Sequence, residues 1–201
     1  MQASRMTSVI RWGLWGASGV PGLFLIWHWQ TGQLGVVPHE VMLHRTGRYA
    51  LLFLMATLAL GFIQAFISWR PLYAARRPLG VWTFLYACGH AMTWLFLDQG
   101  GIWEFALAEM RAMLHVKLGI AGLLLMLPLA LTSVDIAPRL LGFKLWKKLH
   151  LLVWPAAIVV IAHTWVVSRF QSPLVVVLTL VILFLLASRL YAAHAQSKAK
   201  T

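Results

Sequence analysis

Six apolar segments, each about as long as a membrane-spanning helix, follow one another along the chain with short connections between them. A helix needs about 20 predominantly apolar residues to cross the hydrocarbon core of a bilayer. Lipid offers no hydrogen-bond partners, so such segments must satisfy their backbone groups internally as helices. The expected spans cover residues of about 10–30, 49–69, 79–97, 113–133, 149–168 and 173–193.

The composition agrees with a membrane protein. Hydrophobic residues make up 61% of the chain and charged residues 11%, against about 45–50% and about 25% in soluble domains. We therefore expect residues 1–201 to form a single all-α integral membrane domain, a six-transmembrane-helix bundle. The single cysteine, Cys88, excludes an internal disulfide and a cysteine-ligated iron–sulfur cluster. No GxGxxG or P-loop pattern occurs, so a nucleotide-binding domain is not expected.

The formal charge of +12 does not indicate nucleic-acid binding, because the basic residues are scattered between apolar runs rather than gathered in one stripe. They fit the positive-inside rule better. With the N-terminus in the cytoplasm, most Lys and Arg residues fall on the cytoplasmic side, and four acids fall outside: Glu40, Asp98, Glu104 and Glu109. We expect both termini to be cytoplasmic.

Two histidines, His90 and His163, lie well inside apolar spans, where ionisable residues are costly and usually functional. His90 lies roughly 16 Å from the cytoplasmic start of the third span, and His163 lies roughly 19 Å beyond His150 in the fifth. Haem iron takes axial histidines, and helical bundles often hold such sites. We expect His90 and His163 to be the axial ligands of one haem. Hydrogen-bonded structural histidines are the alternative.

His150 lies thirteen residues before His163, near the cytoplasmic surface, and is too far away to share that haem. Thirteen residues of ideal helix leave two side chains roughly 140° apart, although Pro155 can kink the helix between them. His150 is either the ligand of a second site or an interfacial histidine whose polar tip reaches water.

Several stretches together resemble a known family. They are "LYACGHAMTW" around His90, "LWKKLHLLVWPAAIVVIAHTW" with His150 and His163, "HRTGRYAL" at 44–51, "ARRPLGVW" at 75–82 and "LTS" at 131–133. The chain resembles the MsrQ (or YedZ) family, the haem-bearing membrane subunits of periplasmic methionine sulfoxide reductase systems, within the ferric-reductase-like transmembrane superfamily. The resemblance covers nearly the whole chain, and the motif set is specific although single motifs are not.

The resemblance implies b-type haem held between the third and fifth spans. Superfamily members typically carry two haems, with ligands thirteen residues apart on the fifth span and fourteen apart on the third. His150 and His163 match the first spacing, but residue Arg76 stands fourteen before His90. The second haem is therefore absent, or bound by His150 with an unusual sixth ligand, or bound by His150 alone. Arg76 either ligates, pairs with a haem propionate, or anchors the span together with Arg77.

By the same resemblance, His44 lines the outer haem's propionates or a docking surface, with an interfacial cap as the alternative. The implied role is that of an electron-transfer subunit, not a catalytic one, in the bacterial inner membrane. Electrons would come from a cytoplasmic flavin reductase or from quinol, and would pass to a periplasmic molybdenum-containing reductase, MsrP, that repairs methionine sulfoxide. The resemblance also implies bound FMN, but no residues that would bind it can be identified from the sequence.

Two other functions remain open at this point. The same histidines would serve a quinol-oxidising cytochrome b anchor of another respiratory enzyme. A haem-free membrane scaffold or transporter would need none of them as ligands, but paired intramembrane acids and broken-helix repeats, which are common in transporters, are absent from the sequence.

Overall fold

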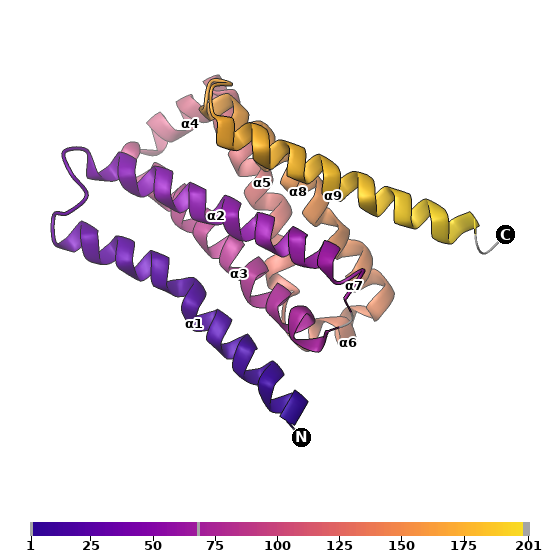
Figure 1. The fold of residues 1–201 in the computed structure, drawn as a ribbon. Coiled ribbons are helices and arrows are strands. Elements are labelled where there is room, and N and C mark those ends of the chain that lie inside the picture. Colours follow the sequence, from indigo (N-terminus) through magenta and orange to yellow (C-terminus); the bar gives the residue numbers. More distant parts are fainter. Residues whose placement is uncertain (1, 68, 199–201) are drawn as a thin grey trace.

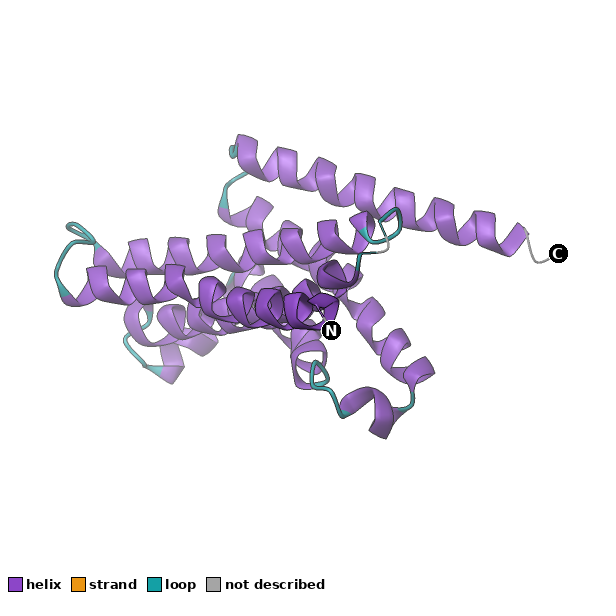
Figure 2. Cartoon of the chain, turned by 60° about the horizontal axis from the view of Figure 1, so that its bottom comes forward, coloured by secondary structure: helices purple, strands orange, loops and turns teal. Residues whose placement is uncertain are grey.

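The computed structural model describes residues 2–67 and 69–198, and this part of the chain is helical without any strand (Figures 1 and 2). The elements in order are α1 (Gln2–Gln30), α2 (Pro38–Ile63), α3 (Arg70–Thr93), a π turn (Trp94–Asp98), α4 (Trp103–Ala112), α5 (Leu114–Leu131), α6 (Ala137–Leu141), α7 (Phe143–Leu149), a 3-10 turn (His150–Leu152), α8 (Val153–Val167) and α9 (Pro173–Lys198).

Each expected segment falls largely on helix, which confirms the all-α fold class. The segment expected at 49–69 is too long, because α2 ends at Ile63, and its residue 68 lies outside the described residues. Four helical runs, 5–30, 38–63, 114–131 and 143–167, are long and apolar enough to span a bilayer by length and composition. The apolar part of α9, Pro173–Arg189, is shorter, and α3 is made more polar by Arg76, Arg77 and His90. Of the helices that carry the six expected spans, α3 and α9 therefore do not meet the criterion of length and composition that the other four meet.

Prolines account for several helix boundaries. Pro38, Pro71 and Pro173 lie in the first turns of α2, α3 and α9, where the missing N–H has no intrahelical partner to lose. The run that contains the fifth expected span changes its hydrogen-bonding pattern at the 3-10 turn that starts at His150. Pro155 cannot donate to the carbonyl four residues before it, which is a physical reason for a break at this point.

Helix α3 lies at the centre of the bundle and packs against α1, α2 and α5, while α8 packs against α5 and α9 (Figure 1). The buried core lies between α2, α8 and α9, and consists of Leu51, Leu54, Met55, Leu58, Ala157, Ile161, Leu178, Ile182 and Leu185. We call the end that carries α4 and the α1–α2 connection the α4 end. The opposite end, with α6 and α7, is the α6 end.

Polar groups and small residues fasten α1 to α3. The hydroxyl of Tyr86 donates to the carbonyl of Ser18 (2.7 Å) and accepts from the amide of Gly22 (2.9 Å), so it lies between two groups four residues apart on α1. A Cβ at Gly19 would lie 2.9 Å from the indole of Trp82. Close helix approach at small residues, with polar side chains bonding across, is typical of membrane bundles.

Candidate functional site: a pair of histidines between α3 and α8

His90 of α3 and His163 of α8 face each other inside the bundle. Their ring centres are 6.1 Å apart and their planes are nearly perpendicular, at 84°. Both side chains are partly buried. The helices that carry them both pack against α5, so the pair lies within the bundle toward the α4 end.

Each imidazole is held by a backbone carbonyl of a neighbouring helix. Nδ1 of His90 lies 2.9 Å from the carbonyl oxygen of Leu43 in α2, and Nδ1 of His163 lies 2.7 Å from that of His115 in α5. A carbonyl oxygen only accepts, so Nδ1 of each ring must carry the proton and Nε2 must hold a free lone pair. None of the described residues bonds to Nε2 of either ring, and such a tautomer is suited to metal ligation.

A glycine four residues after each of these carbonyls makes the approach possible. A Cβ at Gly47, which follows Leu43 on α2, would lie 3.0 Å from Nδ1 of His90. A Cβ at Gly119, which follows His115 on α5, would lie 3.2 Å from the ring of His163. The α2–α3 and α5–α8 pairs thus repeat one arrangement, in which an imidazole packs on a helical glycine and bonds the carbonyl one turn before it.

The pair has the dimensions of a bis-imidazole metal site. Metal–imidazole bonds are about 2.0–2.1 Å long, so two rings on opposite sides of one metal ion have centres about 6.3 Å apart. The observed 6.1 Å agrees with this separation. Within residues 2–67 and 69–198, no group of three or more His, Cys, Asp or Glu side chains could hold a bare ion. Two protein ligands fit a porphyrin-bound iron better, because the macrocycle brings four nitrogen ligands of its own.

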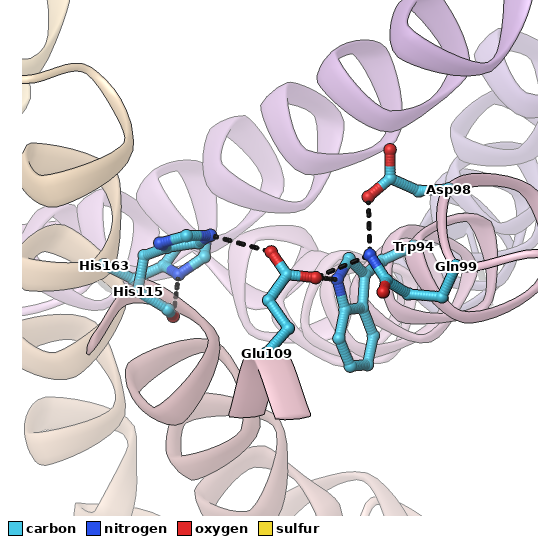
Figure 3. A network of polar contacts seen from close by, with 6 residues as sticks. All are labelled: Trp94, Asp98, Gln99, Glu109, His115 and His163. Carbon is cyan, nitrogen blue, oxygen red and sulfur yellow. Dashed lines mark hydrogen bonds and ion pairs between the residues drawn. The ribbon is translucent and has the colours of Figure 1, made fainter. Parts of the chain in front are cut away.

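A polar network extends from His163 toward the α4 end (Figure 3). Oε2 of Glu109 in α4 accepts hydrogen bonds from Nε1 of Trp94 (3.0 Å) and from the side-chain amide of Gln99. Its other oxygen, Oε1, lies 3.8 Å from Nε2 of His115, the residue whose carbonyl holds His163. Glu109 therefore ties the π turn after α3 to the start of α5, and so supports the backbone that positions His163.

Comparison with known proteins assigns the family. Residues 46–161 match the family described as "Ferric reductase like transmembrane component". A protein of Rhodospirillum rubrum is 35% identical over 142 residues, which is 69% of this chain and 68% of the relative. Its name is "Protein-methionine-sulfoxide reductase heme-binding subunit MsrQ". The chain belongs to the MsrQ family of ferric-reductase-like transmembrane proteins.

Other MsrQ relatives align over more of the chain. One from Azospira oryzae is 34% identical over 182 residues, 89% of this chain and 78% of its own. One from Herminiimonas arsenicoxydans is 33% identical over 172 residues, 84% and 78% of the two chains. No solved structure matches the chain. Membership in a transmembrane family, together with the long apolar helices, makes this a membrane protein.

At the α6 end lie His150 and Arg76, two further residues considered for haem binding. Nδ1 of His150 lies 3.1 Å from the carbonyl oxygen of Trp146 one turn earlier, and its ring packs on that indole with centres 4.2 Å apart. Its Nε2 has no partner among the described residues. Arg76 is close enough to His150 for their charges to interact, but an arginine guanidinium in a protein stays protonated and offers no lone pair. The described residues therefore place one imidazole here, not two.

His44 lies near the histidine pair but is not part of it. It lies on α2 one turn before Gly47, is exposed, and is close enough to His90 for their charges to interact. The sequence interpretation missed Gly47, Gly119 and Glu109. For the two glycines, the sequence offers one indication, which is a glycine inside an apolar helix. The role of Glu109 cannot be predicted from the sequence, because it depends on the packing of α4 against α5.

Proposed function

We propose that this chain is the haem-binding membrane subunit of a protein-methionine-sulfoxide reductase system, and that it transfers electrons through a b-type haem held by His90 and His163. The observation that supports the proposal is the pair of imidazoles 6.1 Å apart, each with Nδ1 bonded to a backbone carbonyl. The MsrQ relatives are described as heme-binding subunits, which also supports haem binding by this chain.

The residues of the chain have separable tasks in this proposal. A bound haem supplies a one-electron couple. His90 and His163 would both hold the iron, which would leave no position open to oxygen and would suit electron transfer rather than oxygen chemistry. The carbonyls of Leu43 and His115 fix the orientation of the rings and raise their basicity as ligands. His44, exposed near His90, would contact the propionates or a docking partner.

One bis-histidine haem is the number that the ligands support. A second haem at the α6 end would have His150 as its only imidazole ligand, because Arg76 stands where a second histidine would be needed. Arg76 would then pair with a propionate instead of ligating.

The orientation we propose places the α4 end in the periplasm and both termini in the cytoplasm of a bacterial inner membrane. Four of the five acids, Glu40, Asp98, Glu104 and Glu109, lie at the α4 end, whereas basic residues gather at the α6 end, as the positive-inside rule requires. Electrons would leave from the α4 end to a periplasmic molybdenum-containing reductase, MsrP. A cytoplasmic flavin reductase, with FMN as a further cofactor, is one class of donor.

Quinol is the other class of donor, and one feature favours it. An apolar hollow of about 500 Å³ lies along the α5–α8 seam and is lined by Leu114, Leu118, Ala162, Trp165, Val166 and Phe170. It is adjacent in sequence to His115 and His163, and its lining suits a lipophilic molecule. The same hollow would serve a quinol-oxidising cytochrome b that supplies a different respiratory enzyme.

Haem analysis of purified variants tests the ligands. His90→Ala and His163→Ala should each lose most of the Soret absorbance per protein, whereas His39→Ala, a histidine in the first turn of α2, should keep it. Normal haem content in both ligand variants would overturn the pairing, and a colourless, correctly folded wild-type protein would favour a haem-free scaffold.

Reduction of the haem by a quinol analogue or by a flavin reductase, followed by reoxidation with purified MsrP, would distinguish the donors and test the partner.

A further inference from the structure

Two arginines at the α6 end have no acidic partner among the described residues. Arg76 of α3 and Arg189 of α9 are close enough to repel each other electrostatically. The chain has only five acidic side chains. Four of them lie at the α4 end, and the fifth, Asp135, pairs with Arg77. Two neighbouring cations at the end of a membrane bundle therefore lack a counter-charge from any side-chain carboxylate.

Two hydrogen-bond donors beside these arginines also lack a partner within the part of the chain that the structure describes. Gln64, which follows α2, is only 8% exposed. Its Oε1 accepts from Nη1 of Arg76 (3.4 Å), and its Nε2 has no partner among residues 2–67 and 69–198. This amide orientation is required, because a guanidinium can only donate. Nε1 of Trp154 in α8 is likewise buried, with no partner in the described part of the chain. The guanidinium of Arg189 lies over the ring of Trp154, 5.4 Å from its centre.

The four side chains form a connected group of donors at the ends of α2, α3, α8 and α9. Gln64 contacts Arg76, Arg76 lies near Arg189, and Arg189 covers Trp154. All of them donate, and none has an acceptor left over except the amide oxygen already used by Arg76. The buried donor atoms are Nε2 of Gln64 and Nε1 of Trp154, whereas Arg76 and Arg189 are exposed. Buried unpaired donors are costly, so these two atoms need an acceptor that the described chain does not provide.

We propose that Arg76, Arg189, Gln64 and Trp154 bind a phosphate ester from outside the chain. A phosphate group offers several charged acceptor oxygens, and arginine forks match them in pairs. Arg189 is exposed, so the group is open to the surroundings of the bundle. Basic pockets between transmembrane helices near the membrane surface bind anionic head groups. An anionic phospholipid is therefore the favoured source, and a free phosphate compound such as a flavin nucleotide has the same chemistry.

The site is separate from the histidine pair. Arg76 and His90 are fourteen residues apart on α3, which is roughly 21 Å along the helix. Loss of the phosphate ligand should therefore leave the haem of His90 and His163 in place, and the two proposals can fail independently.

Native mass spectrometry of the purified full chain tests the site, with phosphatidylglycerol, phosphatidylcholine and FMN added in separate titrations. We expect phosphatidylglycerol to bind at least about tenfold more tightly than phosphatidylcholine, since each basic residue near the membrane surface contributes about 1 kcal/mol. The double variant Arg76→Ala with Arg189→Ala should lose this preference. Gln64→Glu should also lose it, because the new carboxylate would take the place of the ligand beside Arg76.

The matched control is Arg77→Ala with Arg139→Ala, which removes the same charge from the same end and should keep the preference. A monodisperse elution profile and unchanged haem absorbance would show that each variant is folded. Tight FMN binding that depends on the same residues would support a free phosphate as the source. Equal binding of both lipids and no FMN binding would overturn the proposal. Loss of a second haem from the double variant would overturn it in favour of haem carboxylates.

Discussion

Arg76 and His90 occupy equivalent positions on α3, fourteen residues apart, and each packs against a glycine of α2. A Cβ at Gly47 would lie 3.0 Å from the ring of His90, and a Cβ at Gly61 would lie 3.5 Å from the guanidinium of Arg76. The two glycines are also fourteen residues apart, because α2 and α3 are antiparallel neighbours. At both positions a side chain of α3 therefore packs on a glycine of α2, an imidazole at one and a guanidinium at the other.

This relationship predicts the effect of Arg76→His. The new imidazole would face α2, as His90 does fourteen residues further along α3. It would lie near His150, whose Nε2 has no partner among the described residues. The haem-to-protein ratio should rise from about one toward two. If His150 already holds a haem alone, the same change should convert it from a five-coordinate to a six-coordinate spectrum. Pyridine haemochrome assays and absorption spectra distinguish these results.

The control for this gain is Arg77→His. Arg77 lies beside Arg76 but pairs with Asp135, so its replacement should add no haem. A ratio and spectrum that stay unchanged in Arg76→His would contradict the equivalence of the two positions.

Gly47→Ala and Gly119→Ala should weaken haem binding. Each new methyl group would lie 3.0–3.2 Å from a ligand imidazole, so the ring must move away from its carbonyl partner. Overpacking of this kind costs about 1–3 kcal/mol, which corresponds to a loss of affinity of roughly fivefold to 150-fold. Haem transfer to apomyoglobin would measure the loss.

Gly89→Ala is the matched control, since Gly89 precedes His90 and a Cβ there would have no atom of another helix within 4 Å. It should retain haem as well as the wild type, and the alanine should favour the helix by up to about 1 kcal/mol. Equal haem retention in all three variants would contradict the role assigned to the glycines.

Glu109→Gln should raise the haem midpoint potential. The carboxylate lies 3.8 Å from His115, whose carbonyl holds His163, and a negative charge near the iron favours the ferric state. Its removal should shift the potential upward on the order of tens of millivolts. Glu104→Gln, an exposed acid in the first turn of α4, should shift it less. A redox titration in which both variants change equally would indicate a general charge effect instead of a specific contact.

Asp135→Asn should lower stability slightly at neutral pH and not in acid. Arg77 donates a hydrogen bond to Asp135 and adds an attractive charge, and together these hold the pKa of the carboxyl below its ordinary value of 3.8. A depressed pKa stabilises the fold above pH 3.8, and this contribution disappears as the pH falls through the folded-state pKa. Because Asp135 is 77% exposed, the effect should stay within about 1 kcal/mol.

Thermal unfolding of the wild type and Asp135→Asn in detergent, followed by circular dichroism across pH, checks this sign. A difference in melting temperature that grows as the pH falls below 3.8 would refute it. The interaction matters structurally because it joins the start of α3 to the connection between α5 and α6.

The helices themselves could be predicted from local composition. Each expected span falls largely on a helix, because apolar runs of about 20 residues have few other ways to satisfy their backbone in lipid. Boundaries were less predictable. Helix α2 begins at Pro38, well before residue 49, because the first turns of a helix can lie outside the apolar region and carry His39, Glu40 and His44.

The sequence by itself determined that this chain is a helical membrane protein and that His90 and His163 lie at similar depth, because hydropathy and helical rise are properties of single segments. Only the tertiary structure decided which helix faces which. It set the 6.1 Å between the two rings, the carbonyls of Leu43 and His115 that orient them, the glycines that admit them, and the contact between Glu109 and His115. Those features depend on side-by-side packing of segments far apart in the chain, which no local pattern encodes.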